Sequence, residues 1–369
     1  MLRQPMLTVT SALTLANPIT LTTNGTINTQ ADVTASGAVT GTGILTKTGA
    51  NTLTMTGASS FGGTTISAGT VTFSAAANVG TTVSLNGGKL QLTASAPSAV
   101  TLASPSITAS GGTIENLSTQ TLTLTSSSGT GALIKNGSGP LTLSGASSRS
   151  GTTTVNAGGL RLDHYQSLGS GNLTLATNTS LELAGNIGSA NPVANAIAIT
   201  GPVTVDSKGY TGYFNGPITG AQALTVQGSG GTVVVGGTNT PSSTTVTSGT
   251  LALLNSSSSF SNPVNVGSGA TFDISQGPAT PTLANVTTVV GSNIKLGSQA
   301  LSLTSGTIAG NLLDGGISGT TGATLTKTGG GILTLTGTNT YAGGTILQAG
   351  TININNIHAL GTGALNYAI

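Results

Sequence analysis

The stretch that decides the fold spans residues 325–354 and reads LTKTGGGILTLTGTNTYAGGTILQAGTINI. Within it, Leu and Ile alternate with Thr, which is the period-two pattern of a β-strand with one apolar face. Clusters of Gly and Asn interrupt the alternation, and these residues favour tight turns. The stretch therefore predicts several short strands joined by corners, without helical periodicity.

The stretch also predicts the course of one coil. We expect Leu325 to point inward with Lys327 two residues further on, and a second strand at 333–335. A polar corner follows, then a third strand at 345–346 and a final turn at Ala349 and Gly350. We expect these three strands to form the three faces of one coil of about 20 to 25 residues.

Repetition of this stretch separates a solenoid from a closed fold. Similar segments start at Leu45, Leu133 and Leu224, so the best copies are residues 45–74, 133–163, 224–254 and 325–354. A barrel or sandwich closes on itself, whereas an open stack of coils repeats one motif along the chain. We predict an all-β fold, a right-handed single-stranded parallel β-helix (β-solenoid) of degenerate repeats. It is expected to run continuously over residues 1–369 without evident caps.

Ten positions recur at the expected turns and corners of these copies. They are Gly or aromatic residues at the ends of strands, where a tight turn or a filled corner is needed. The positions are Gly57, Phe61, Gly69, Gly145, Gly158, Gly237, Gly249, Gly337, Tyr341 and Gly350.

Composition excludes several classes of protein. Only 4% of the residues are charged, and the nine cations are spread over 369 residues, so we expect no nucleic-acid binding. No window approaches the ~18 consecutive apolar residues of a membrane-spanning helix. The absence of Cys fits a cytosolic protein, and it also suits a chain that crosses an oxidising compartment unfolded. The first residues lack the apolar core of a signal peptide, so we expect a processed chain or a fragment.

The copies resemble the passenger-associated β-strand repeats of autotransporter proteins, whose pattern runs roughly LTKTGxGTLTLSGxNTYTGGTTIxAGTL. Residues 325–352 match it almost throughout, including Asn339 and Tyr341, and residues 45–71 match with Phe61 as the aromatic residue. The other two copies depart from it, with Arg149 and Pro241 at the aromatic position. The resemblance implies a secreted β-helical passenger on the outer surface of a Gram-negative-type bacterium.

From this resemblance we expect an extracellular structural or surface-display rod that supports adhesion or self-association. Cell-surface or matrix molecules are its expected partners, and no cofactor or metal is expected. An alternative is a subunit whose terminal coils stack end to end into an extracellular filament, because unpaired strand edges template further pairing.

A β-helix polysaccharide lyase or hydrolase is a further alternative. Glycosidic chemistry needs two carboxylates about 5 to 9.5 Å apart. Of the seven acids, Asp163 and Glu182 are closest to one coil apart, and we expect both to be solvated turn or edge carboxylates. We therefore expect no enzyme. The complete set is Asp32, Glu115, Asp163, Glu182, Asp206, Asp273 and Asp314.

Histidine, glycine and threonine patterns have structural interpretations. His164 and His358 each precede a Leu-Gly pair, so we expect both in a turn of the repeat, and two histidines without Cys are too few for zinc. Gly runs at 228–231 and 329–331 precede no helix, so they predict corners and not phosphate loops. Thr-x-Thr triplets such as 121–123 could bind ice only if stacked in register, and we expect them at irregular intervals.

Overall fold

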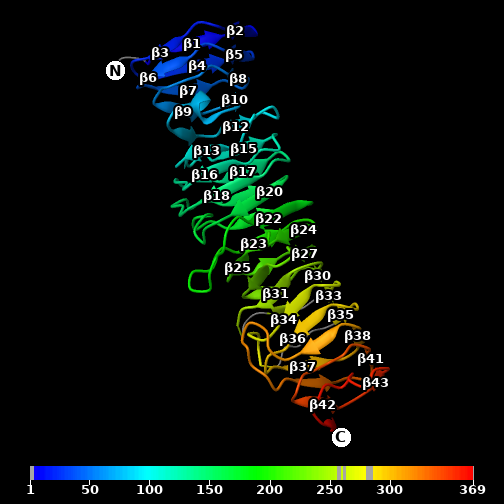
Figure 1. The fold of residues 1–369 in the computed structure, drawn as a ribbon. Helices are drawn as coiled ribbons and strands as arrows, with labels where there is room; N and C mark the ends of the chain where they lie inside the picture. The colour runs from blue at the N-terminus through cyan, green and yellow to red at the C-terminus, as the bar shows by residue number, and fades with distance from the viewer. Residues whose placement is uncertain (1–3, 256–258, 261–262, 280–285, 369) are drawn as a thin grey trace. The chain divides into compact units, whose positions relative to one another are not determined.

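The structure is a computed structural model that describes residues 4–255, 259–260, 263–279 and 286–368. It divides into two compact units, Met1–Thr179 and Ser180–Ile369, each built of short parallel strands stacked coil on coil (Figure 1). Among the described residues there is no α-helix, and the one 3₁₀ turn is η1 (Ala76–Val79). The prediction of an all-β parallel solenoid is therefore confirmed.

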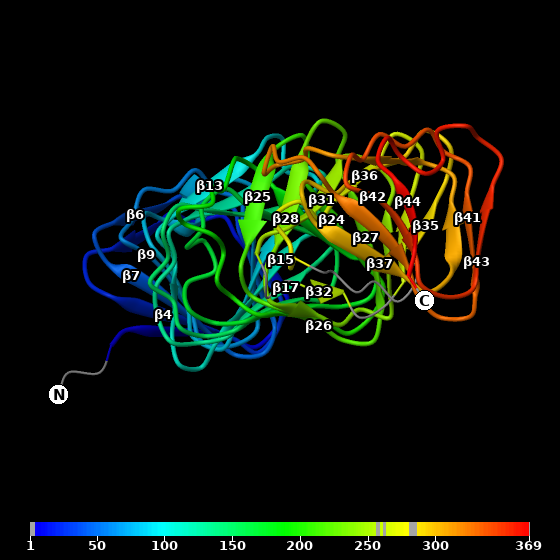
Figure 2. The same cartoon turned by 90° about the horizontal axis from the view of Figure 1, so that it is seen from below.

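Three faces recur from coil to coil in the first unit. Strands of one face pair in parallel with the strands of the same face in the next coil. Figure 2 shows the coils from below. The first face holds β1 (Met6–Val9), β4 (Gly25–Thr29), β7 (Ile44–Thr48), β9 (Gly63–Ile66), β11 (Val83–Leu85) and β14 (Ser106–Ile107). The second holds β2 (Leu13–Leu15), β5 (Val33–Ala35), β8 (Thr52–Met55), β10 (Thr70–Phe73), β12 (Lys89–Leu92), β15 (Gly112–Asn116), β17 (Leu133–Asn136), β19 (Thr153–Val155) and β21 (Leu173–Leu175). The third holds β3 (Ile19–Leu21) and β6 (Val39–Gly41), then β13 (Val100–Ala103), β16 (Leu122–Thr125), β18 (Leu141–Ser144) and β20 (Gly159–Leu162).

The second unit is built in the same way, after β22 (Thr179–Leu183) at the boundary. One sheet holds β24 (Val203–Asp206), β27 (Ala223–Gln227), β30 (Ser243–Val246), β33 (Val264–Val266), β35 (Val286–Thr288), β38 (Gly306–Ile308), β41 (Ile332–Leu335) and β43 (Thr351–Ile354). Another holds β25 (Thr211–Phe214), β28 (Thr232–Val235), β31 (Thr250–Leu253), β34 (Thr271–Asp273), β36 (Asn293–Lys295) and β39 (Asn311–Leu313). The remaining strands are β23 (Ile197–Ile199) with β26 (Ile218–Thr219), β29 (Thr238–Asn239) with β32 (Ser259–Phe260), and β37 (Ala300–Leu303), β40 (Thr324–Lys327), β42 (Gly344–Leu347) and β44 (Leu365–Tyr367).

The core consists of columns of aliphatic side chains inside the coils. In β8 the side chains of Leu53 and Met55 are buried, whereas Thr52 and Thr54 are half-buried on the outer face. Strand register then stacks inward residues directly on each other, and each fully buried aliphatic side chain contributes about 1.5 to 3 kcal/mol. One such column is Leu53, Val71, Leu90 and Ile114.

The order of strands within a repeat differs from the expected one. The third strand of the first copy, β9, pairs with its first strand β7, so that Leu45 lies beside Thr64. The last strand β10 likewise pairs with β8. The third strand therefore begins the next coil, and the expectation that three strands of a repeat form one coil was wrong. Period two marks inward residues but does not tell which parallel strands are neighbours.

A turn with backbone hydrogen bonds between residues three apart follows three of the copies. In the first it is η1, which ends at Val79 and Gly80. Backbone turns enclose the equivalent Leu168 and Gly169 of the second copy and Leu360 and Gly361 of the fourth. The Leu-Gly pair predicted the last two of these turns, but not the first, where Val79 replaces Leu.

Candidate functional site

Three repeat copies contain a fully buried lysine, at Lys47, Lys135 and Lys327. It lies two residues after an inward Leu, so period two places it on the inner face of the strand. The Lys47 Nζ donates to the carbonyl oxygens of Thr48 (2.9 Å), Gly49 (2.8 Å) and Ala68 (3.0 Å). One ammonium group thereby joins the turn after the first strand of the repeat to the turn after the third.

The other two lysines repeat this arrangement. Lys135 donates to three carbonyl oxygens at 2.7–3.1 Å, and Lys327 donates to three at 2.7–3.0 Å. An ammonium group has three donors, and burial of a charged group is tolerated when its donors are satisfied. The sequence placed Lys47 and Lys327 in line with inward Leu residues, but their carbonyl partners become visible only when successive coils are stacked.

Burial changes the ionisation of these lysines. It lowers the pKa of Lys47 to about 8, although the negative charge of Asp32 opposes the shift. It also lowers the pKa of Lys135 to about 8, opposed by Glu115, and it lowers the pKa of Lys327. The buried ammonium groups are therefore held in place at a cost in desolvation.

This shift predicts an unusual pH dependence of stability. Between pH 8 and pH 10 the unfolded chain binds more protons than the folded chain, because the unfolded lysine pKa is 10.5. The free energy of unfolding is therefore expected to rise over this window. Urea unfolding at pH 8, 9 and 10 measures it, and the rise should become smaller when Lys47 and Lys135 are both replaced by Met, because Lys327 still contributes. A wild-type stability that falls from pH 8 to pH 9 would contradict this assignment.

One buried corner of the repeat is filled by three different side chains, Phe61, Arg149 and Tyr341. The Tyr341 hydroxyl shares a 2.5 Å hydrogen bond with Thr345 Oγ1, which also bonds the Leu360 carbonyl oxygen at 3.0 Å. Burial raises the pKa of Tyr341 to about 12, despite the hydrogen bond with Thr345. The corner therefore links the aromatic position to the turn that follows the repeat.

Arg149 makes the same link with a guanidinium group. Its Nη2 donates to Thr153 Oγ1 at 2.6 Å and to the Leu168 carbonyl oxygen at 3.2 Å. Its Nε has no hydrogen-bond partner among the described residues, and burial lowers the pKa of Arg149 to about 10. A cation can thus replace Tyr at this corner, because the equivalent Thr and the equivalent carbonyl group of this copy accept its hydrogen bonds.

The glycines at the expected turns fall into three groups. Gly69, Gly158, Gly249 and Gly350 have positive φ, and a Cβ would lie within 3.0 Å of the preceding coil's backbone. Gly57 and Gly337 have ordinary φ, but a Cβ would lie 2.3 Å and 1.9 Å from a carbonyl oxygen of the preceding coil. Gly145 and Gly237 have positive φ with space for a Cβ. Close stacking of coils, and not turn geometry alone, therefore requires glycine at six of the eight positions.

The copy at residues 224–254 departs from the others. Val226 replaces the buried lysine, and Pro241 occupies the aromatic position. Two serines form hydrogen bonds with Gly228 in this turn. Ser207 Oγ donates to the Gly228 carbonyl oxygen at 3.0 Å, and Gly228 N donates to Ser248 Oγ at 3.1 Å. Hydroxyl groups therefore replace the ammonium group in this coil.

All seven carboxylates have hydrogen-bond or ion-pair partners. Asp32, Asp163, Asp206, Asp273 and Asp314 accept hydrogen bonds from backbone N–H groups. Glu115 accepts from Lys89 Nζ and Gln91 Nε2, both at 2.6 Å, and these bonds hold its pKa below the usual value, led by the Lys89 bond. No group of three or more His, Cys, Asp or Glu residues that could hold a metal occurs in the described part of the chain.

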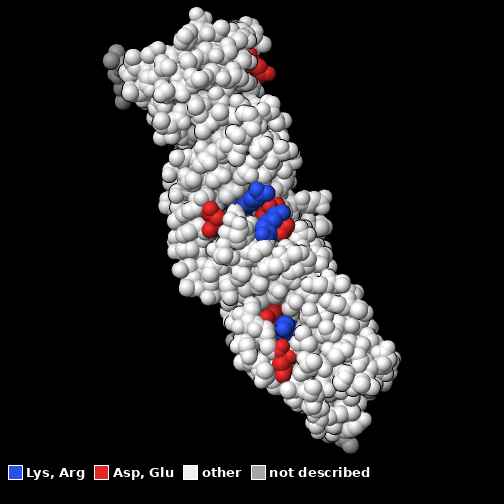
Figure 3. Space-filling view, in the orientation of Figure 1, with Lys and Arg blue, Asp and Glu red and all other residues white. Residues whose placement is uncertain are grey.

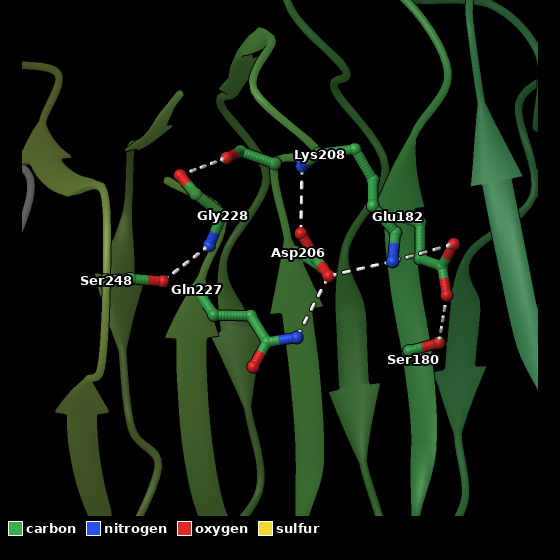
Figure 4. A network of polar contacts seen from close by, with 8 residues as sticks. Ser180, Glu182, Asp206, Lys208, Gln227, Gly228 and Ser248 are labelled. Atoms are coloured by element: carbon green, nitrogen blue, oxygen red, sulfur yellow. Dashed lines mark hydrogen bonds and ion pairs between the residues drawn. The ribbon is translucent and has the colours of Figure 1, made fainter. Parts of the chain in front are cut away.

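A polar cluster links several strands of the second unit (Figure 4). Lys208 Nζ lies 3.0 Å from Asp206 Oδ2 and 3.6 Å from Glu182 Oε2, and Gln227 Nε2 donates to Asp206 Oδ2 at 2.9 Å. Burial disfavours ionisation of Asp206, but the bonds from Gln227 and Lys208 outweigh it and lower the pKa of Asp206. The side chains therefore link successive coils as a ladder.

The two carboxylates considered for glycosidic chemistry, Asp163 and Glu182, accept hydrogen bonds from different partners. Asp163 lies in the first unit, where its Oδ1 accepts from Gly145 N at 3.1 Å. Glu182 lies in the second unit and accepts from Ser180 Oγ at 2.8 Å. His164 and His358 both lie in turns, where their backbone N–H groups donate to a Ser and an Asn side chain of the same turn.

The outer face of the second unit carries a column of uncharged polar residues. The strand register aligns one polar residue from each of eight strands, and all eight side chains are half-buried or exposed. The column is one residue wide and is not a stack of Thr-x-Thr triplets, because the outward positions two residues further on vary, with Gln227 after Thr225 and Val289 after Thr287. Figure 3 shows charges only as small groups on a largely uncharged face. The column is Thr204, Thr225, Thr245, Asn265, Thr287, Thr307, Thr334 and Asn353.

Comparison with known families agrees with the repeats. Residues 45–73, 133–162 and 325–354 match the family model described as Passenger-associated-transport-repeat, and together they make up about a quarter of the chain. The copy at 224–254, with Val226 in place of lysine, lies outside these matches. No curated protein and no solved structure matches the chain. No helix in the described residues is both long and apolar enough to span a membrane. The chain is therefore a β-solenoid that carries passenger-associated transport repeats, and these repeats suggest a secreted autotransporter passenger.

Proposed function

We propose that the chain is a structural rod of an autotransporter-like passenger on the outer surface of a Gram-negative-type bacterium, where it supports adhesion or self-association. The observation that carries this proposal is that the repeated residues lie where successive coils meet. The buried lysine, the filled corner and the stacked glycines all join one coil to the next. Repetition of interior residues supports a scaffold more than a site of chemistry.

The outer surface supports a role in adhesion or self-association. Hydroxyl and amide groups both donate and accept hydrogen bonds, so the column from Thr204 to Asn353 is complementary to polar surfaces and to a second copy of itself. Few charges oppose close approach, since 4% of residues are charged. Each contact is weak, and many in parallel raise the avidity.

We also propose that the chain is not an enzyme. Its carboxylates hold backbone N–H groups, lysines or hydroxyl groups, which supports a structural role for each of them. Assay of uronate polymers with Ca²⁺ tests this. Turnover that is lost in Asp163→Asn or Glu182→Gln would favour a polysaccharide lyase instead.

A display experiment tests the proposed function. The chain is fused between a signal peptide and an autotransporter translocator, and bacteria are scored for surface exposure, settling and adhesion to matrix. We expect surface exposure and faster settling, and we expect Thr225→Lys with Thr245→Lys to reduce settling at least threefold without loss of exposure. Unchanged settling in this variant would contradict the role of the column. Long fibres of the purified chain in negative stain would favour the end-to-end filament.

A further inference from the structure

The third face of the first unit contains a break. Its early coils carry β3 and β6, and Ser60 forms a parallel bridge with Thr40 of β6. The coil that follows has η1 at this point instead of a strand. The next strand on the face, β13, therefore begins a new sheet, and β16 is its one strand partner among the described residues.

The unpaired edge of β13 has free backbone groups. Val100 N donates to the Thr121 carbonyl oxygen at 2.9 Å, and Ser104 N donates to the Thr125 carbonyl oxygen at 2.8 Å, so the even-numbered residues face β16. In a strand the backbone groups of successive residues point to opposite sides. The N–H and C=O groups of Thr101 and Ala103 therefore point toward the break, and both residues are exposed.

A groove of about 320 Å³ lies along this edge. Ser59 and Ser60 line it on the side opposite β13, and Ala76, Ala77 and Val83 also contribute to its wall. None of the residues that line it is charged. A parallel-sheet edge thus faces a narrow, uncharged slot.

The chain's own segment at this point is held in another conformation. Asn78 Oδ1 accepts from Ser74 N at 3.1 Å and from Ala75 N at 2.9 Å, and Asn78 Nδ2 donates to the Gly57 carbonyl oxygen at 2.9 Å. Asn78 is buried. These bonds stabilise η1, so the segment that would complete the face does not pair with β13.

We propose that the edge of β13 binds one extended, uncharged segment of a partner protein as an added strand. Exposed sheet edges accept strands in this way, through backbone hydrogen bonds with side chains alternating between the two faces. The middle residue of the segment would lie beside buried Leu102 and face Phe61, so it is aliphatic. A charge there would be buried without a partner. The residues on either side of this aliphatic residue would carry hydroxyl groups, which are complementary to Thr101 and to the serines across the groove.

The test uses the synthetic peptide acetyl-Gly-Thr-Val-Thr-Gly-amide and amide hydrogen exchange measured by NMR on the full chain. We expect the amides of Thr101 and Ala103 to exchange fast in the free chain and at least tenfold more slowly with saturating peptide. The same peptide with Glu in place of Val is expected to give no protection. Absence of protection at millimolar peptide, or full protection in the free monomer, would overturn the proposal.

Two variants isolate the edge. Ala103→Pro removes an outward N–H group without affecting a bond to β16, and it is expected to weaken peptide binding at least fivefold. Ala103→Ser keeps the N–H group and should bind as the wild type does. Unchanged exchange of Leu122 and Leu124 shows that the proline variant is folded, and equal binding by this folded variant would contradict the proposal. Protection that rises with chain concentration in the absence of peptide would assign the edge to a second copy and overturn the assignment to another protein.

Discussion

Gly69→Ala is expected to lower the free energy of unfolding by about 3 to 4 kcal/mol. Gly69 has a φ of +65°, and a Cβ there would lie 2.4 Å from the Gly49 carbonyl oxygen and 2.7 Å from Lys47 Nζ. The substitution therefore adds backbone strain and also pushes apart the two turns that Lys47 joins. Urea unfolding followed by far-ultraviolet circular dichroism measures the change.

Gly145→Ala is the matched control in the same unit. Gly145 has a similar φ of +72°, but the nearest atom to its Cβ would be Ser126 Oγ at 3.4 Å. Only the left-handed conformation then opposes alanine, at about 1 to 2 kcal/mol. Equal losses in the two variants would show that coil stacking does not select glycine at position 69.

Lys47→Met is expected to lower the free energy of unfolding by about 2 to 4 kcal/mol. Methionine keeps the apolar volume but leaves the carbonyl groups of Gly49 and Ala68 without the lysine donor. A buried acceptor that loses its donor costs more than an average hydrogen bond contributes. The loss is measured by urea unfolding at pH 7, where the folded-state pKa of about 8 keeps the ammonium group charged.

Thr46→Ala controls for changes on the same strand. Thr46 is half-buried on the outer face of β7, and outward substitutions of this kind usually change stability by less than about 0.5 kcal/mol. A Lys47→Met loss as small as that of the control would mean that water satisfies the carbonyl groups. The buried ammonium group would then contribute little to joining the turns.

Much of the fold could be predicted because its signals are local and repeated. Alternation at Leu53 and Met55 marks an inner face, and four copies of one motif indicate stacking. Both were confirmed as a parallel β-solenoid. Gly69 and Gly350 were predicted as turn residues, and the structure gives both positive φ.

The remaining features depend on which coil lies beside which. The carbonyl partner Ala68 is 21 residues from Lys47, and nothing in the local sequence links them. The same holds for Arg149 and Leu168, whose contact explains how a cation fills an aromatic corner. The break beside β13 could not be predicted, because it arises where η1 takes the place of a strand between β6 and β13 on the third face.

The central claim is that successive coils lie in parallel register, and spin labels test it most directly. The chain has no Cys, so nitroxides can be attached at Thr34→Cys with Thr54→Cys, which are direct neighbours on β5 and β8. Thr14→Cys with Thr54→Cys places the labels two coils apart. Neighbouring parallel strands are about 4.8 Å apart, so we expect strong dipolar broadening of the electron paramagnetic resonance spectrum in the first pair and weaker broadening in the second. Absence of broadening in the first pair would contradict the stacked-coil structure.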